Sequence, residues 1–128
     1  GDKGAPTQPT MWEMNLKSFV THPAGGQMRA GLTQVHGVAY SGSSPVGAVE
    51  VSVDGGKTWR AARFFGPDLG RYAWRQFVLP VILPAGSYEI TSRAIAEDGE
   101  VQPELRVENE RAYAHNGWRD HAVKVTVA

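Results

Sequence analysis

The stretch of the chain best equipped for chemistry lies near its C-terminal end, at residues 109–119. It reads Asn-Glu-Arg-Ala-Tyr-Ala-His-Asn-Gly-Trp-Arg, so arginine, asparagine, histidine, tyrosine and tryptophan follow one another closely. An arginine guanidinium presents a fixed fork of donors that suits a tetrahedral oxyanion. Composition alone favours a simpler interpretation, a polar surface loop whose arginines make ion pairs, because loops are commonly polar.

Other familiar catalytic or metal-binding patterns are absent from the sequence. The four histidines, His22, His36, His115 and His121, are scattered without the spacing of a zinc site. Neither glycine pair, at 25–26 or 55–56, has the spacing of a phosphate-binding loop, and residues 41–44 do not form a nucleophile elbow. The carboxylates near positions 97–100 sit in a predicted turn, where a solvated hairpin end is the expected structure.

Composition narrows the class of protein. The chain has 128 residues, enough for one domain with its own core, and its 13 basic and 13 acidic residues give a formal net charge of zero. That balance argues against a nucleic-acid binder held by bulk charge. The absence of cysteine removes disulfides, thiol catalysis and thiolate metal ligands from this chain. No apolar run is long enough to span a membrane, and no signal peptide is visible at Gly1.

The elements that must position residues 109–119 are predicted to be strands. Val49, Val51 and Val53 alternate with polar residues, which is typical of a half-buried strand. The Asp-Gly-Gly at 54–56 then predicts a hairpin turn, with Trp59 at the start of the return strand. Further strands are expected at 15–21, 34–41, 72–81, 87–97 and 122–127, with a linker at 1–14 and a long loop at 101–116.

These strands predict one all-β domain over residues 15–128, a sandwich of about seven antiparallel strands in two packed sheets. No stretch has the periodicity of a long helix. We expect Trp59 and Trp74 to be the central aromatic residues of its core, together with Val51, Ile90 and Val125. With no cysteine, packing alone must hold the two sheets together.

Several segments resemble, in the same order, the C-terminal dimerisation domain of the sulfite oxidase family of molybdenum enzymes. Residues 49–59 resemble its Val-x-Val-Ser-x-Asp-Gly-Gly-x-Thr-Trp hairpin, and residues 109–118 its Asn-x-Arg-Gly-x-x-x-Asn-x-Trp segment. Weaker matches occur at 16–23, 35–42, 72–75 and 93–103, the last containing the Gln-Pro pair at 102–103. The resemblance covers residues 16–127, and Ala112 departs from the family's glycine.

The resemblance implies an immunoglobulin-like sandwich that is one part of a longer oxidoreductase. In the family, a separate domain holds molybdopterin through a cysteine thiolate, so this chain alone is expected to be inactive, without a cofactor or catalytic residues of its own. Its partners would be that domain and a second copy of itself, which would meet it along the strands at 72–83 or 122–127. By position, Arg111 would bind the substrate anion, with Tyr113 and His115 as possible helpers.

The resemblance also favours a particular parent enzyme. Related nitrate reductases carry an apolar residue where this chain has Arg111, so the arginine favours sulfite as substrate. Residues 66–72 look more like bacterial sulfite dehydrogenases than animal enzymes, which implies a periplasmic location and a cytochrome c as electron acceptor. Two alternatives stay open: an immunoglobulin-like binding or adhesion module, which exposed aromatics such as Tyr40 or Trp12 would support, and a sulfur carrier, which would need a reactive cysteine.

Overall fold

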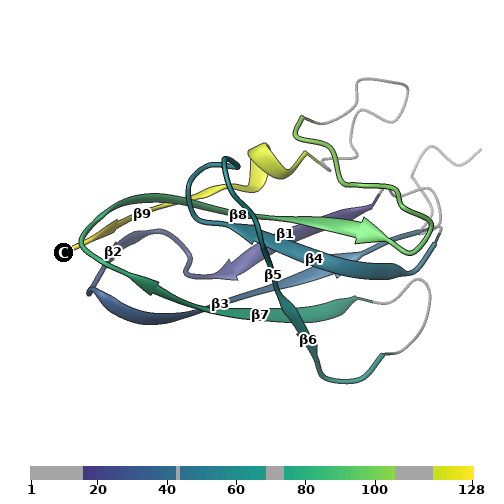
Figure 1. The fold of residues 1–128 in the computed structure, drawn as a ribbon, viewed down its shortest axis with the longest axis horizontal. Helices are drawn as coiled ribbons and strands as arrows, with labels where there is room; N and C mark the ends of the chain where they lie inside the picture. Colours follow the sequence, from purple (N-terminus) through teal and green to yellow (C-terminus); the bar gives the residue numbers. More distant parts are fainter. Residues whose placement is uncertain (1–15, 43, 69–73, 106–116) are drawn as a thin grey trace, which may run out of the picture.

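Two β-sheets packed face to face form the protein, as Figure 1 shows in the computed structural model. The structure describes residues 16–42, 44–68, 74–105 and 117–128. Within these residues there are nine strands and one short 3₁₀ helix: β1 (Lys17–His22), β2 (Gly26–Met28), β3 (Gly31–Tyr40), β4 (Val46–Ser52), β5 (Arg60–Ala61), β6 (Arg63–Phe65), β7 (Arg75–Leu83), β8 (Gly86–Ala96), η2 (Trp118–His121) and β9 (Val123–Val127).

The strand order confirms the predicted all-β sandwich. One sheet has four strands in the order β1-β3-β7-β6, and the other has five in the order β2-β9-β8-β4-β5. Neighbouring strands are antiparallel except for β2 and β9, which are parallel. The chain changes sheet between β1 and β2 and again between β5 and β6, so each crossing adds a short edge strand to the sheet it enters. No described helix is long and apolar enough to cross a membrane.

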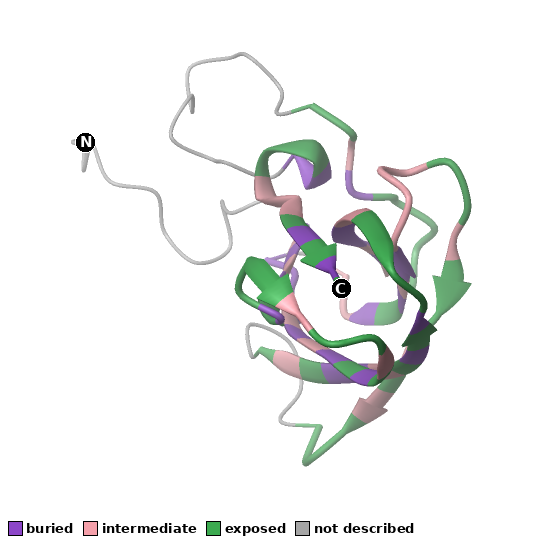
Figure 2. Ribbon diagram, turned by 90° about the vertical axis from the view of Figure 1, so that its left-hand side faces the viewer, coloured by how far each residue is buried: buried purple, intermediate pink, exposed green. Residues whose placement is uncertain are grey.

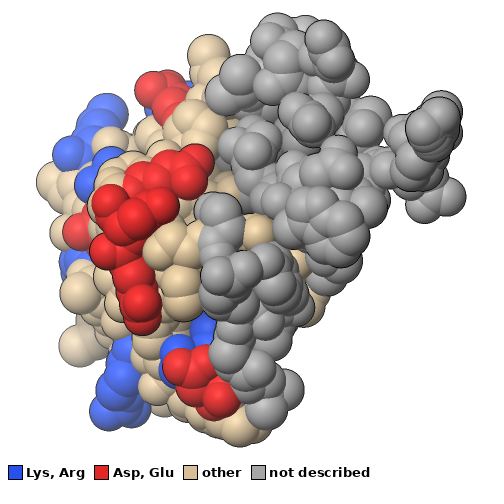
Figure 3. All heavy atoms as spheres, turned by 90° about the vertical axis from the view of Figure 1, so that its right-hand side faces the viewer, with Lys and Arg blue, Asp and Glu red and all other residues tan. Residues whose placement is uncertain are grey.

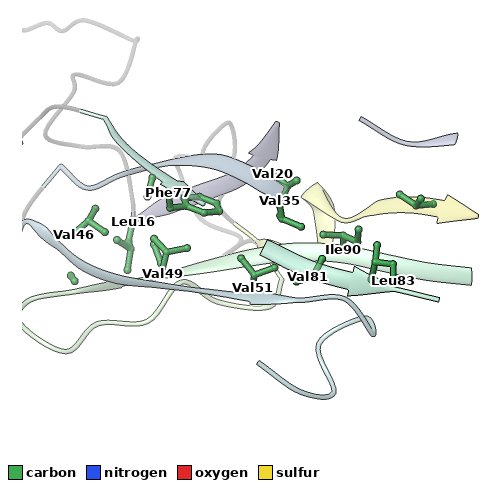
Figure 4. Packing of buried hydrophobic residues seen from close by; sticks show 14 of the residues in the cluster. Leu16, Val20, Val35, Val46, Val49, Val51, Phe77, Val81, Leu83 and Ile90 are labelled. Atoms are coloured by element: carbon green, nitrogen blue, oxygen red, sulfur yellow. The ribbon is translucent and has the colours of Figure 1, made fainter. Parts of the chain in front are cut away.

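The core forms where the inner faces of the two sheets meet. Along β3, Thr33, Val35, Gly37 and Ala39 are buried and alternate with more exposed residues, which is the period of two that a half-buried strand requires. Figure 4 shows valine, leucine, isoleucine and phenylalanine side chains from both sheets meeting between them, and Figure 2 shows the buried residues on the inward sides of the strands. Full burial of such a side chain stabilises the fold by about 1.5–3 kcal/mol.

Gly37 is needed for its lack of a side chain. It lies on the inner face of β3 opposite Phe77 of β7. A Cβ atom at this position would collide with the Phe77 ring and with the backbone oxygen of Phe19. Any larger residue would therefore push the fully buried Phe77 out of the core.

The structure corrects the predicted identity of the core aromatics. Trp74 is 40% exposed and Trp59 is only partly buried, whereas Tyr40 and Phe77 are fully buried. The prediction failed because it ranked the residues by size, while burial depends on which face of a strand a residue occupies. The predicted core positions Val51, Ile90 and Val125 are buried, as expected.

The central hairpin also differs in detail from the prediction. β4 ends at Ser52 and β5 begins at Arg60, with Val51 opposite Arg60, so the connection is a loop over 53–59 rather than a tight turn. Gly55 and Gly56 do have positive φ, at 75° and 96°, as their place in the turn requires. Trp59 belongs to this loop and not to the return strand.

Candidate functional site

The residues predicted to bind the anion, Arg111, Tyr113 and His115, lie outside the described residues. The structure does describe the framework on either side of them, at Gln102 to Leu105 and from Gly117 onward. We refer to this framework, together with the 53–59 loop that contacts it, as the platform. The sequence did not predict the 3₁₀ helix η2, which forms part of it.

The two described ends next to residues 106–116 are joined to each other. The backbone N–H of Trp118 donates a hydrogen bond to the oxygen of Pro103 at 2.9 Å, and the N–H of Arg119 donates to the oxygen of Glu104 at 2.9 Å. The Arg119 guanidinium also pairs with Glu104 through Nε and Oε2 at 2.6 Å. The intervening residues therefore begin and end at the same place in the fold.

Buried polar side chains fix the first of these ends in the core. Gln102, Ser18 and Ser92 are each no more than 1% exposed. The Ser18 hydroxyl donates to Gln102 Oε1 at 2.8 Å, the N–H of Ala94 donates to the same oxygen at 3.0 Å, and Gln102 Nε2 donates to the oxygen of Ser18 at 3.3 Å. Because unpaired buried polar groups are costly, this network holds Gln102 against β1 and β8. The sequence signal was the Gln-Pro pair, but nothing local marked its burial.

Trp118 fixes the second end. It is 6% exposed, and its ring meets Trp59 edge to face at a centroid distance of 5.0 Å. A Cβ atom at Gly56 would collide with its indole, so the glycine makes room for the tryptophan. Its backbone oxygen accepts a hydrogen bond from the Thr91 hydroxyl at 2.6 Å. The 53–59 loop and η2 thus support each other.

Asp54 holds the 53–59 loop in shape. Its carboxylate accepts hydrogen bonds from the hydroxyl of Thr58 at 2.6 Å, the hydroxyl of Ser52 at 2.7 Å and the backbone N–H groups of Thr58 and Lys57 at 2.9 and 3.0 Å. These bonds, that of the Thr58 hydroxyl first, hold the pKa of Asp54 well below its usual range. The sequence suggested only a turn-forming aspartate, and its four donors became evident from the structure.

The cations of the platform are already engaged. Arg119 pairs with Glu104, lies over the Trp118 ring at 4.8 Å and donates to the oxygen of Gly55 at 3.3 Å. Arg93 pairs with Glu50 at 2.8 Å and stacks on Trp59 at 4.1 Å. These arginines therefore serve to hold the platform together rather than to bind an incoming anion.

A shallow hollow of about 600 Å³ lies beside the 53–59 loop, over β2, β9 and β8. Its lining includes Lys57 and Lys124 but also Asp54 and Glu89, so its charges compensate each other. This hollow does not offer the excess of positive charge that an anion pocket needs. Among the described residues, no three histidine or acidic side chains are grouped so that they could hold a metal ion.

The acidic residues at 97–100 have the structure that the sequence predicts. Residues 97–100 are exposed and form the turn after β8. Figure 3 shows acidic side chains gathered on this end of the molecule, the right-hand end of Figure 1. The exposed aromatic surface that would have indicated a binding module is not found at Tyr40, which is fully buried, and Trp12 lies outside the described residues.

Comparison with known proteins places this platform in a recognised type of domain. Residues 8–128 match the family described as "Mo-co oxidoreductase dimerisation domain". The mitochondrial sulfite oxidase of Macaca fascicularis is 34% identical over 129 residues, which cover 94% of this chain and 23% of that protein. A nitrate reductase [NADH] of Phaseolus vulgaris is 34% identical over 83% of this chain and 14% of its own length.

A solved structure supports the same relationship. The sulfane dehydrogenase SoxCD from Paracoccus pantotrophus superimposes with a TM-score of 0.65 at 29% identity, over 85% of this chain and 28% of that one. The chain spans about a quarter of the length of the sulfite oxidases it matches. The similarity therefore concerns one domain of larger enzymes.

Proposed function

This chain belongs to the Mo-co oxidoreductase dimerisation-domain family, and on that premise we propose that it pairs two copies of a sulfite-oxidising molybdenum enzyme and completes the pocket that receives sulfite. Relatives named sulfite oxidase match it over nearly its whole length. Since the chain spans about a quarter of those relatives, the oxidation itself is assigned to the remainder of a longer enzyme.

The observation that carries the pocket-completing role is the joined base of residues 106–116. The hydrogen bonds from Trp118 to Pro103 and from Arg119 to Glu104 provide a fixed support for whatever those residues hold. We infer that Arg111 is presented from this support to the sulfite anion, with Tyr113 and His115 as further donors. Arginine keeps its charge at any working pH, which a sulfite site requires.

The molybdenum cofactor is assigned to a different domain. In the family a cysteine thiolate holds it, and this chain has no cysteine. The described residues also lack a metal-binding group of three histidines or carboxylates. The residues present therefore do not fit the cofactor, and the chain's part is to position and to pair.

The acceptor and the location of the parent enzyme are further parts of the proposal. The pattern Gly-Pro-Asp-Leu-Gly-Arg-Tyr at 66–72 resembles bacterial sulfite dehydrogenases and supports a periplasmic enzyme that passes electrons to a cytochrome c. Reduction of a cytochrome c by the purified parent enzyme on addition of sulfite would test the acceptor. Cell fractionation would test the location.

A nitrate-reducing parent is the second candidate. It is favoured by the similarity to the nitrate reductase of Phaseolus vulgaris, at an identity equal to that of the sulfite oxidase. Turnover of sulfite and of nitrate by the same preparation of the parent enzyme distinguishes the two. Arg111 supports sulfite, because the related nitrate reductases carry an apolar residue at that position.

Arg111→Gln in the molybdenum-loaded parent enzyme tests the pocket. We expect kcat/KM for sulfite to fall about tenfold to a hundredfold, mainly through KM, because a charge-assisted contact contributes roughly 1.5–3 kcal/mol. The matched control is Arg29→Gln, which removes an exposed arginine between β2 and β3. Equal kcat/KM values for the two variants would show that Arg111 does not touch the substrate.

A further inference from the structure

The outer face of the four-stranded sheet is unusually apolar for a surface. On β3 and β7 the outward residues alternate with the buried core residues of the same strands. We call this surface the apolar face; it is formed by Leu32, His36, Val38, Phe65, Val78 and Ile82. Contiguous apolar patches on a soluble protein commonly mark an interaction site.

The exposed hydrophobic residues gather on this face. Leu32 and Ile82 stand opposite each other in the β3–β7 register and are 68% and 72% exposed. Phe65 on β6 is 38% exposed, and Trp74, just before β7, is 40% exposed. Among the described residues, only Val101 and Leu105 are large hydrophobic side chains exposed elsewhere.

Charge is confined to the edges of the face. None of its four strands contains an aspartate or a glutamate. Lys17 and Arg63 belong to the edge strands β1 and β6, while Arg75 is engaged with Asp68 at 3.2 Å and with the Phe64 ring at 4.2 Å. An uncharged centre with a polar rim is the usual anatomy of a protein–protein interface.

The outer face of the other sheet has the opposite character. Glu50 and Arg93 form an ion pair across β4 and β8, and Glu89 stands opposite Lys124 across β8 and β9. The 53–59 loop and η2 contact this side, and Thr91 on β8 is fully buried beneath Trp118. The apolar face is thus the one left open for a partner.

The size of the apolar face suits pairing. A strand of ten residues such as β3 is about 33 Å long, and four strands are about 19 Å wide, so the face measures on the order of 600 Å². A standard interface takes about 800 Å² from each partner. Side-chain relief and the rim would supply the difference.

We propose that the apolar face is the surface on which a second copy of this chain docks, with Leu32 and Ile82 in its centre. The inference rests on the proposed pairing function and specifies where it occurs. A face without carboxylates offers a different, charged partner little complementarity, whereas an apolar patch is complementary to itself across a two-fold axis. The matched family is described as a dimerisation domain, which agrees with this occupant.

The test is sedimentation equilibrium of the 128-residue chain carrying Ile82→Glu. Because the charge would be buried between two copies, we expect dimer dissociation to strengthen by about 30-fold or more. Leu105→Glu is the matched control, since Leu105 is 62% exposed and lies outside the face, and it should leave the dimer intact. Leu32→Gln provides a milder second variant if Ile82→Glu fails to fold, as judged by circular dichroism.

Each outcome decides between the proposals. A wild-type dimer that both face variants leave unchanged overturns the apolar face and leaves pairing itself in place. A wild-type chain that stays monomeric at the highest attainable concentration overturns the face as a self-docking surface and indicates that another domain of the parent enzyme covers it. Selective loss of the dimer in the face variants supports the proposal.

Discussion

The two sheets share one core but turn very different surfaces outward. The five-stranded sheet is covered by the chain's own 53–59 loop and by η2, which are held by Asp54 and Trp118. The four-stranded sheet leaves Leu32 and Ile82 in solvent. Both sheets have the same alternation of buried and outward residues, so the difference comes entirely from the outward set.

This difference separates two tasks within one domain. On the covered side, hydrogen bonds and ring contacts fix a platform that holds the ends of residues 106–116 in place. On the open side, apolar residues stay available for contacts with a second molecule. Substitutions on the covered side should therefore mainly lower folding stability, and those on the open side should mainly change association.

The largest expected effect on this comparison is from truncating one tryptophan on each side. Trp118→Ala removes a side chain that is 6% exposed and packed on Trp59, so we expect the free energy of unfolding to fall by roughly 3–5 kcal/mol. Trp74→Ala removes a side chain that is 40% exposed, with a loss of about 1 kcal/mol. Chemical denaturation measures both. Equal losses would contradict the distinction between the two sides.

A smaller effect is expected from Asp54→Asn. The carboxylate accepts hydrogen bonds from Thr58, Ser52 and Lys57, and losing the charge should cost about 1–2 kcal/mol at neutral pH. The folded state lowers the pKa of Asp54, so its stabilising contribution is present above the unfolded value of about 4 and is lost as the pH falls below it.

The pH dependence provides the control for Asp54. Thermal unfolding from pH 7 to pH 2 should show a steeper acid loss of stability in the wild type than in Asp54→Asn. Asp120→Asn, which changes an exposed aspartate in η2, should retain the wild-type profile. If both variants follow the wild type, the hydrogen bonds to Asp54 do not stabilise the 53–59 loop.

The smallest expected effect concerns His22 and His36, which are neighbours across β1 and β3 with ring centroids 6.4 Å apart. Histidine ordinarily gains its proton between about pH 8 and 5. The other ionisable groups on or beside the face are cationic or already paired: Lys17, Arg63, Arg75 with Asp68, and His121, which contacts Phe19. Acidification should therefore weaken dimer association about fivefold through like-charge repulsion.

Replacing both histidines with glutamine should remove this pH dependence without abolishing the dimer. The measurement is the dimer dissociation constant at pH 8 and at pH 5.5. A wild-type constant that does not change with pH would place His22 and His36 away from the contact between the two copies.

Much of the domain was predictable from local pattern. The alternation of Val49 and Val51 predicted a strand because a period of two is imposed by backbone geometry alone. Glycines at 55 and 56 predicted a turn because positive φ is a property of single residues. The family resemblance of residues 49–59 and 109–118 added the type of enzyme, which no periodicity could indicate.

The sequence by itself thus determined the strands, the all-β class and the family, since these depend on neighbours along the chain or on motif order. Only the tertiary structure decided that Tyr40 and Phe77 are buried while Trp74 is exposed, and that Gln102 pairs with Ser18 across the core. It alone showed which sheet is covered by the chain's own loops. The physical reason is that burial and hydrogen bonding between residues far apart in sequence depend on how the sheets pack, which no local pattern records.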